Sequence, residues 1–269
     1  MEQYYYITAC VMFAVFGLCI GSFLNVVIYR LPRGMNLAKP ASHCTTCDHK
    51  LAWYDNIPLL SYVILRGKCR YCGASVSPRY FVVELINCVL WLMCPLTMYF
   101  SRGIWFSLVC ALAISLLLAM SLIDMENLFI PDSLQICFFL VAVGGIFADG
   151  QTGWQDKLYG LLLGGGFFLF FYCASFVLFK REGMGFGDVK LMASAGLFLG
   201  WKATIASIVF AIVVALADIV LRKIFIRSGR EGLGDVSEEF AFAPYLALGV
   251  FAAMLFGNAL VDGYMALFV

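Results

Sequence analysis

The stretch of sequence that decides the fold is ALAISLLLAMSLID, residues 111–124, an uncharged apolar run that ends in Asp124. A carboxylate near the centre of a membrane-spanning helix costs about 2.5–3.5 kcal/mol to insert, so such a residue is a functional candidate. A second aspartate, Asp188, follows the tripeptide GFG at 185–187 and directly precedes another apolar segment. If these two carboxylates come close to each other in the folded chain, they form a candidate catalytic pair.

The composition of the 269-residue chain is that of a membrane protein. Hydrophobic residues make up 63% of it and charged residues 13%, whereas a soluble globular chain is roughly 45–50% apolar and about 25% charged. Of the eleven cysteines, seven lie in apolar runs, where we interpret them as small buried hydrophobes: Cys10, Cys19, Cys88, Cys94, Cys110, Cys137 and Cys173. The sequence therefore predicts an all-α, polytopic membrane protein.

A helix needs about 20 mostly apolar residues to span a bilayer, with a range of about 17–25. The chain contains eight apolar runs that we interpret as helices, at 7–28, 80–100, 104–123, 129–148, 158–179, 189–199, 203–221 and 242–259. We expect three parts: a first transmembrane helix at 1–30, a cytoplasmic loop domain at 31–79, and a transmembrane peptidase domain at 80–269 with about seven helices.

The distribution of lysine and arginine predicts the orientation, because basic residues stay on the cytoplasmic side. The polar segment 30–79 holds eight of them and only two acidic residues, and further basic clusters lie at 180–190 and 222–230. Eight helices put these three segments on one side, whereas seven would put 222–230 on the other. We therefore expect both termini outside the cytoplasm, with Asp124 and Asp188 at one depth near the cytoplasmic face.

The polar loop carries two CxxC motifs, Cys44-Thr45-Thr46-Cys47 and Cys69-Arg70-Tyr71-Cys72. Four thiolates at this spacing can close a tetrahedral shell around zinc, with no open position for catalysis. Two disulfides or thiol redox chemistry are the alternatives, and the reducing cytoplasm disfavours disulfides. Because the loop is too small for a stable core of its own, we expect structural zinc bound by Cys44, Cys47, Cys69 and Cys72.

Asp124 and Asp188 have the chemistry of a hydrolytic pair. When two carboxylates lie close together, one of them keeps a proton. The ionised member can then activate water while the protonated member donates to a peptide carbonyl. Gly185 and Gly187 lack a Cβ, so we expect them to form a tight turn that lets a substrate backbone approach Asp188.

Three other carboxylates have simpler interpretations. Asp132, at the start of a helix, is expected to be a helix cap or an interfacial residue. Asp218 lies four positions before Arg222 and is expected to form an ion pair with it. Glu84, near the start of the second apolar run, is expected to pair with an Arg or Lys of the loop, with a role at a ligand site as the alternative.

Together these motifs resemble those of the bacterial type IV prepilin peptidases, the leader peptidase/N-methyltransferases. The shared stretches cover nearly the whole chain: GSFLNVVIYRLP at 21–32, both CxxC motifs, WYDNIPLLS at 53–61, SPRY at 77–80, VEL at 83–85, ID at 123–124, IPD at 130–132, GMGFGDVKL at 183–191 and APYLALG at 243–249. This chain has Ala243 where the family's last motif has Gly, a difference that concerns helix packing more than catalysis.

The resemblance implies a GxGD aspartic endopeptidase of the bacterial inner membrane, with Asp124 and Asp188 as its catalytic residues. Its substrates would be prepilins or pseudopilins, cut on the cytoplasmic side after the glycine that ends a short basic leader. Nucleic acid is not an expected partner.

The resemblance also implies methylation of the new N-terminus with S-adenosylmethionine, in the region of the zinc loop. Methyl transfer or substrate docking would use Gly67, together with Lys68 and Glu84.

Two other functions remain open. A presenilin-like intramembrane protease would cut within spanning helices, would need its aspartates deeper in the membrane, and has no use for a four-cysteine loop. A non-enzymatic transporter or proton relay would use carboxylates at mid-membrane. Such a protein would favour repeated halves and broken helices, which the sequence does not display.

Overall fold

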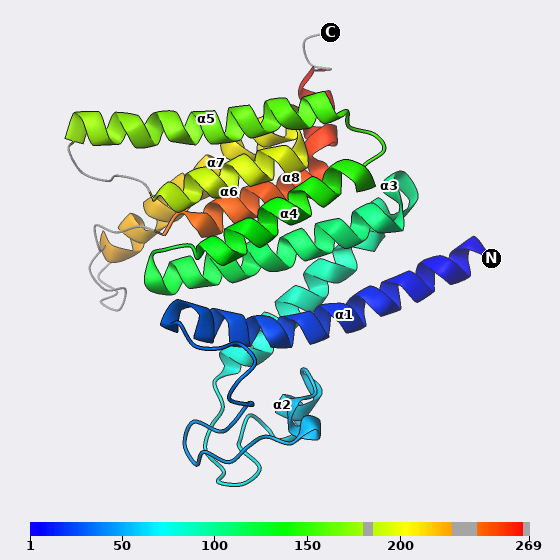
Figure 1. Cartoon of the computed structure of the whole chain (residues 1–269), viewed down its shortest axis with the longest axis vertical. Helices are drawn as coiled ribbons and strands as arrows, with labels where there is room; N and C mark the ends of the chain where they lie inside the picture. The colour runs from blue at the N-terminus through cyan, green and yellow to red at the C-terminus, as the bar shows by residue number, and fades with distance from the viewer. Residues whose placement is uncertain (180–184, 228–240, 266–269) are drawn as a thin grey trace. The chain divides into compact units, whose positions relative to one another are not determined.

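The computed structural model describes residues 1–179, 185–227 and 241–265, and its architecture is helical (Figure 1). The main helices are α1 (Glu2–Arg30), α3 (Pro78–Asn127), α4 (Asp132–Ala148), α5 (Trp154–Phe179), α6 (Phe186–Leu199), α7 (Trp201–Arg227) and α8 (Ala243–Met265). The loop after α1 holds three short ones, η1 (Leu31–Arg33), η2 (Trp53–Asn56) and α2 (Leu60–Ile64). The predicted all-α class is confirmed.

Four of the described helices, α1, α3, α5 and α7, are long and apolar enough to cross a membrane. The chain is therefore a membrane protein, while the number of spans stays a prediction. Lys180 and Arg181, and the part of the basic cluster after residue 227, lie outside the described residues. The orientation that rests on them also stays a prediction.

The chain forms two compact units, Met1–Ser115 and Leu116–Val269. The boundary falls inside α3, a 50-residue helix that is interrupted at Gly103, whose φ is 87°. Glycine tolerates this positive φ because it has no Cβ. The interruption lies where the sequence predicted a break between the apolar runs 80–100 and 104–123.

In the first unit, α1 packs closely on the beginning of α3 through a glycine. A Cβ added to Gly17 would lie 2.8 Å from the Cβ of Trp91. The side chain of Asn87 donates a hydrogen bond of 2.7 Å to the Gly17 carbonyl, and Ser115 donates one of 2.8 Å to Asn87. Trp91 in turn donates to Ser115. These buried polar groups satisfy one another, as groups in an apolar environment must.

In the second unit, α6 is the central helix and packs against α4, α5, α7 and α8, which surround it in Figure 1. Glycines permit the closest of these approaches, because a Cβ on Gly160 or Gly164 of α5 would overlap the backbone of α6. Small residues commonly allow membrane helices to pack backbone to backbone. α6 spans only 14 residues and begins two residues before Asp188, so close packing holds that aspartate in place.

A fully buried lysine joins three elements of this unit. Lys157, near the start of α5, is 0% exposed, and its ammonium lies 3.1 Å from a carboxylate oxygen of Asp149. It also donates to the carbonyl oxygens of Gly145 and Phe198, which lie in the last turns of α4 and α6. A cation is favourable there because the carbonyl end of a helix carries partial negative charge. The sequence offered no sign of this ion pair.

Candidate functional site

Asp124 sits near the end of α3 and is 7% exposed. Its Oδ2 accepts a hydrogen bond of 3.1 Å from the backbone amide of Ala243, the first residue of α8. The first amides of a helix have no partner inside that helix. The Asp124 carboxylate therefore acts as a capping group for α8, and this hydrogen bond fixes the orientation of the carboxylate.

Asp188 lies in the first turn of α6 and is likewise 7% exposed. Its backbone amide donates to the carbonyl of Gly185, which closes the turn at the start of the helix. The carboxylate is near enough to Asp124 for the two charges to act on each other. The predicted pair is thus brought into one neighbourhood of the second unit.

The segment that follows α3 explains how the two aspartates come together. A Cβ added to Gly187 would lie 3.3 Å from side-chain atoms of Ile130, so this glycine allows the turn to pack on that segment. The Gln135 side chain donates a hydrogen bond of 2.8 Å to the Gly187 carbonyl. The start of α6 is therefore attached to residues that follow Asp124 closely in the chain. Sequence reasoning gave Gln135 no role, although a glutamine in an apolar helix is a signal that could have identified it.

The competing carboxylates have partners of their own. Asp132 begins α4, forms an exposed ion pair of 2.6 Å with Lys190, and makes no side-chain cap hydrogen bond. Asp218 forms the predicted pair with Arg222 at 2.6 Å. Asp218 also accepts a hydrogen bond of 2.6 Å from the hydroxyl of Tyr245.

In the first unit the four loop cysteines form a cluster whose sulfur atoms all lie within 4.8 Å of one another. Sulfurs held about 2.3 Å from a tetrahedral zinc ion are about 3.8 Å apart, and the Sγ atoms of Cys44 and Cys72 lie 3.8 Å apart. Each CxxC turn is closed by backbone hydrogen bonds, from Cys44 to the His49 carbonyl and from Cys69 to the Ala74 carbonyl. The cluster fits a zinc site.

The thiols of this cluster differ in their acidity. Backbone amides of Thr46 and Cys47 donate to Cys44 and lower the pKa of its thiol to about 6. An amide of Ala74 has the same effect on Cys72, but burial and hydrogen bonding with the neighbouring thiols outweigh it and raise the pKa of Cys72 to about 11. Four thiolates this close together repel one another, so full ionisation requires a cation between them.

An ion pair joins the second CxxC motif to η2. Arg70 donates to Asp55 at 2.6 Å, and the Tyr71 hydroxyl donates to the other oxygen of Asp55 at 3.2 Å. The Asp55 side chain is 1% exposed. Burial raises the pKa of Asp55, but the hydrogen bonds from Arg70 and Tyr71 outweigh it and lower the pKa below its usual value.

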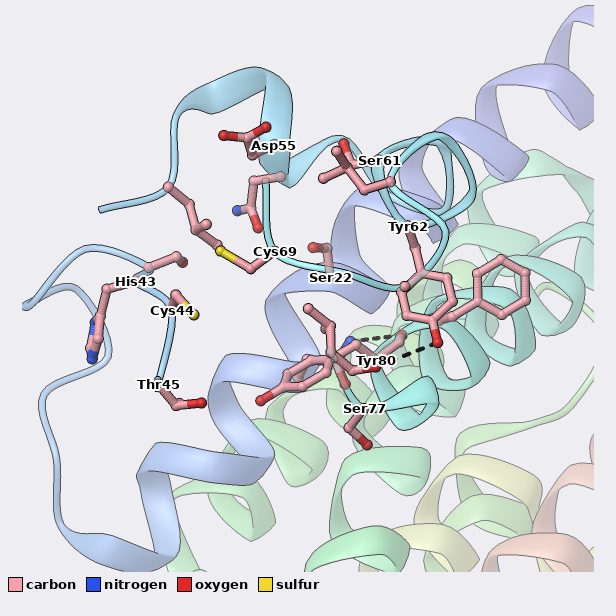
Figure 2. A pocket seen from close by; sticks show the side chains of 18 of the residues that line it. Ser22, His43, Cys44, Thr45, Asp55, Ser61, Tyr62, Cys69, Ser77 and Tyr80 are labelled. Carbon is pink, nitrogen blue, oxygen red and sulfur yellow. Dashed lines mark hydrogen bonds between the residues drawn. The ribbon is translucent and has the colours of Figure 1, made fainter. Parts of the chain in front are cut away.

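A cavity of about 490 Å³ lies between the cysteine cluster, the end of α1 and the start of α3. Its volume is within the range of about 300–1,000 Å³ that ligand pockets occupy. Figure 2 shows Cys44 and Cys69 on one side of it and Tyr62 and Tyr80 on the other. Gly67 also lines the cavity, in a turn with φ 67°. The cavity thus combines aromatic rings, polar side chains and two of the sulfurs.

Glu84 has a different partner from the one predicted. Its Oε2 accepts a hydrogen bond of 2.8 Å from the backbone amide of Leu59, rather than an ion pair from an Arg or Lys. Leu59 has a φ of 56°, a conformation that a leucine rarely adopts. The buried carboxylate therefore holds a strained turn at the start of α2 against α3. Glu84 also lines the cavity together with Lys68.

Comparisons with known proteins divide the chain at nearly the same place as its two compact units. Residues 15–98 match the bacterial peptidase A24 N-terminal domain, and residues 111–221 match the type IV leader peptidase family. The chain does not match any solved structure.

Several relatives are called prepilin leader peptidase/N-methyltransferase. The relative from Aeromonas hydrophila is 33% identical over 279 residues, covering 94% of this chain and 93% of its own length. The one from Stutzerimonas stutzeri is 34% identical over 281 residues, covering 93% and 92%. The one from Myxococcus xanthus is 41% identical over 209 residues, or 74% of this chain, which spans 60% of that relative.

Proposed function

Because the chain belongs to the type IV leader peptidase family, we propose that it is a membrane aspartic endopeptidase that removes the leader of prepilins or pseudopilins. The observation that carries this proposal is the convergence of Asp124 and Asp188, both buried, in one neighbourhood of the second unit. The A24 N-terminal match and the relatives' names support a second activity, N-methylation of the product.

The cleavage step follows from the chemistry of a carboxylate pair. The ionised aspartate takes a proton from water as the oxygen attacks the peptide carbonyl, and the protonated aspartate donates to the carbonyl oxygen. The tetrahedral intermediate collapses as one of its hydroxyls returns a proton to the second carboxylate, the C–N bond breaks, and the leaving amine receives the proton that the first carboxylate took. Gly185 and Gly187, on either side of Phe186, leave two positions of the turn before Asp188 without a side chain, where a substrate backbone would approach.

The expected site of cleavage is the cytoplasmic face of the bacterial inner membrane. The eight basic residues at 30–79 support this orientation. A prepilin's apolar N-terminal helix would lie in the bilayer, and its basic leader would remain in the cytoplasm. The junction between them would then reach the aspartates at the end of α3 and the start of α6.

For methylation we propose that the cavity of the first unit binds S-adenosylmethionine, which supplies the methyl group. Tyr62 and Tyr80 provide aromatic rings that suit an adenine ring or a sulfonium cation. Gly67, Lys68 and Glu84 line the same cavity. The donor set of aromatic, basic and acidic groups therefore fits this cofactor.

The four clustered cysteines would hold a structural zinc ion beside this cavity. Their sulfur spacing supports four-coordinate binding. With every coordination position filled, zinc would stabilise the loop and would take no part in the chemistry.

The proposed function is tested by mass spectrometry of the product N-terminus. Purified protein is incubated with a prepilin-like peptide and S-adenosylmethionine. We expect a single cut directly after the leader glycine, and a mass increase of one methyl group on the new N-terminal residue. A peptide that remains intact, or one cut within its apolar helix, would contradict the proposal.

Replacing Cys44 and Cys47 by serine is expected to separate the two activities. The double variant should lose bound zinc, from about one ion per chain to near zero, because two of four ligands are gone. Methylation should fall with it, whereas cleavage should stay within about twofold if the two activities occupy separate units. Metal analysis and product mass spectrometry report both effects, with Cys137→Ser, a cysteine of the second unit, as the control. Loss of cleavage in a well-folded double variant would show that the loop serves the peptidase.

Gly67→Ala is expected to weaken binding of S-adenosylmethionine at least about fivefold without changing cleavage. A Cβ at this position would lie 2.9 Å from the Tyr62 hydroxyl, so the ring that lines the cavity must move. Gly34→Ala is the matched control, since Gly34 has a similar φ of 63° but no atom within 4 Å of an added Cβ. Both changes impose a similar backbone penalty, of about 1–2 kcal/mol. Calorimetric titration measures the affinity, and equal losses in both variants would place the cofactor elsewhere.

A further inference from the structure

Gln135 of α4 has one half of its amide paired, while the other half has no partner among the residues that the structure describes. The residue is 4% exposed, and its Nε2 donates to the Gly187 carbonyl at 2.8 Å. Its Oε1 is buried, and no group among residues 1–179, 185–227 and 241–265 donates a hydrogen bond to it. Buried acceptors are nearly always satisfied in folded proteins, so such an exception calls for an explanation.

The orientation of the amide follows from its neighbour. If the amide were turned by 180°, Oε1 would face the Gly187 carbonyl oxygen, and two acceptors would be in contact. The nitrogen therefore points at Gly187, and Oε1 is the atom for which the described part of the chain offers no donor. A methionine would fill the same space in an apolar helix without burying a polar atom, so packing alone does not account for a glutamine here.

The position of Gln135 suggests which group donates a hydrogen bond to its Oε1. The Gly187 carbonyl that it holds belongs to the residue directly before Asp188. A peptide that lies extended across Asp188 brings its own backbone N–H groups to this neighbourhood. Away from water, each of those N–H groups needs an acceptor.

We propose that Gln135 Oε1 accepts a backbone N–H of the substrate next to the bond that is cut. In this role Gln135 binds substrate with one end of its amide and positions the Asp188 turn with the other. The inference rests on the proposed peptidase function and concerns the same site. Its ligand is the main chain of the peptide, so the contact serves any leader sequence.

The first test asks whether cleavage depends on the Gln135 side chain. In Gln135→Met the loss of one neutral hydrogen bond to substrate should lower kcat/KM about 3- to 10-fold, and the melting temperature should fall because the donor to the Gly187 carbonyl is lost as well. Ser207→Ala is the matched control, because Ser207 Oγ is also buried without a partner among the described residues but lies on α7. Its kcat/KM should stay at the wild-type value. A Gln135→Met variant that keeps wild-type kcat/KM would overturn the proposal, whatever its melting temperature.

The second test identifies the bond itself and uses the wild-type protein. A series of prepilin-like peptides is prepared in which one backbone amide near the cleavage site is replaced by an ester, which lacks the N–H. One ester position should lower wild-type kcat/KM about 3- to 10-fold and have no such effect in Gln135→Met, whereas Ser207→Ala should respond like wild type. Esters that affect all three proteins equally would overturn the proposal. Failure of wild-type protein to cleave the all-amide peptide would instead contradict the peptidase function.

Discussion

Asp124→Asn and Asp188→Asn are each expected to lower the rate of prepilin cleavage by about 10²- to 10⁴-fold, the range that a positioned acid or base contributes. Asparagine has nearly the shape of aspartate, but it neither takes a proton from water nor donates one to a carbonyl oxygen. In Asp124→Asn the side-chain oxygen can still accept the Ala243 amide. The start of α8 should therefore remain in place, and the loss should be one of chemistry.

The controls decide between a chemical and a structural effect. Asp156→Asn changes a carboxylate of the same unit whose partner is the indole of Trp201, and this variant should cleave at close to the wild-type rate. Both Asp variants should still bind the substrate peptide, as measured by cross-linking or fluorescence anisotropy. If either of them cleaves at more than about a tenth of the wild-type rate, the aspartyl mechanism is wrong.

Lys157→Met is expected to cause the largest loss of stability, about 3–5 kcal/mol, the range for removing one partner of a buried ion pair. The change leaves the Asp149 carboxylate buried without the ammonium now 3.1 Å away. It also removes the donor to the last turns of α4 and α6. We expect a clearly lower melting temperature in detergent or nanodiscs, with cleavage retained at low temperature, because the pair lies at the opposite end of α6 from Asp188.

A double variant isolates the buried charge. Lys157→Met combined with Asp149→Leu removes both partners, and well-packed apolar replacements of an ion pair are often neutral. The double variant should therefore recover most of the stability that the single variant loses, which gives a large coupling in a double-mutant cycle. Additive losses would mean that the lysine acts through its carbonyl contacts instead of through its charge.

The helices of this protein were predictable because each one depends on local composition. The eight apolar runs and the break between residues 100 and 104 were readable directly, and the structure has helices at all eight runs. The four-cysteine cluster was predictable for a similar reason, since each CxxC pair is closed by its own turn. Asp124 and Asp188 could be singled out because carboxylates are rare beside apolar segments.

The partners of these residues could not be predicted in the same way. The amide of Ala243 reaches Asp124 only because α8 begins beside the end of α3. Glu84 was expected to bind a cation and instead holds the strained turn at Leu59. A backbone amide carries no signature in the sequence, so only the packing of helices could reveal such a partner.

By itself the sequence determined the all-α membrane class and the cysteine cluster and singled out the two candidate aspartates, because each depends on residue type and short-range spacing. Only the tertiary structure decided what holds those residues in place: the Ala243 amide on Asp124, Gln135 on the turn before Asp188, and Lys157 across the ends of α4 and α6. These contacts join residues distant in the chain, and many sequences with the same apolar pattern would lack them. Their geometry follows from how the helices pack, above all from the close glycine contacts of α5 and α6.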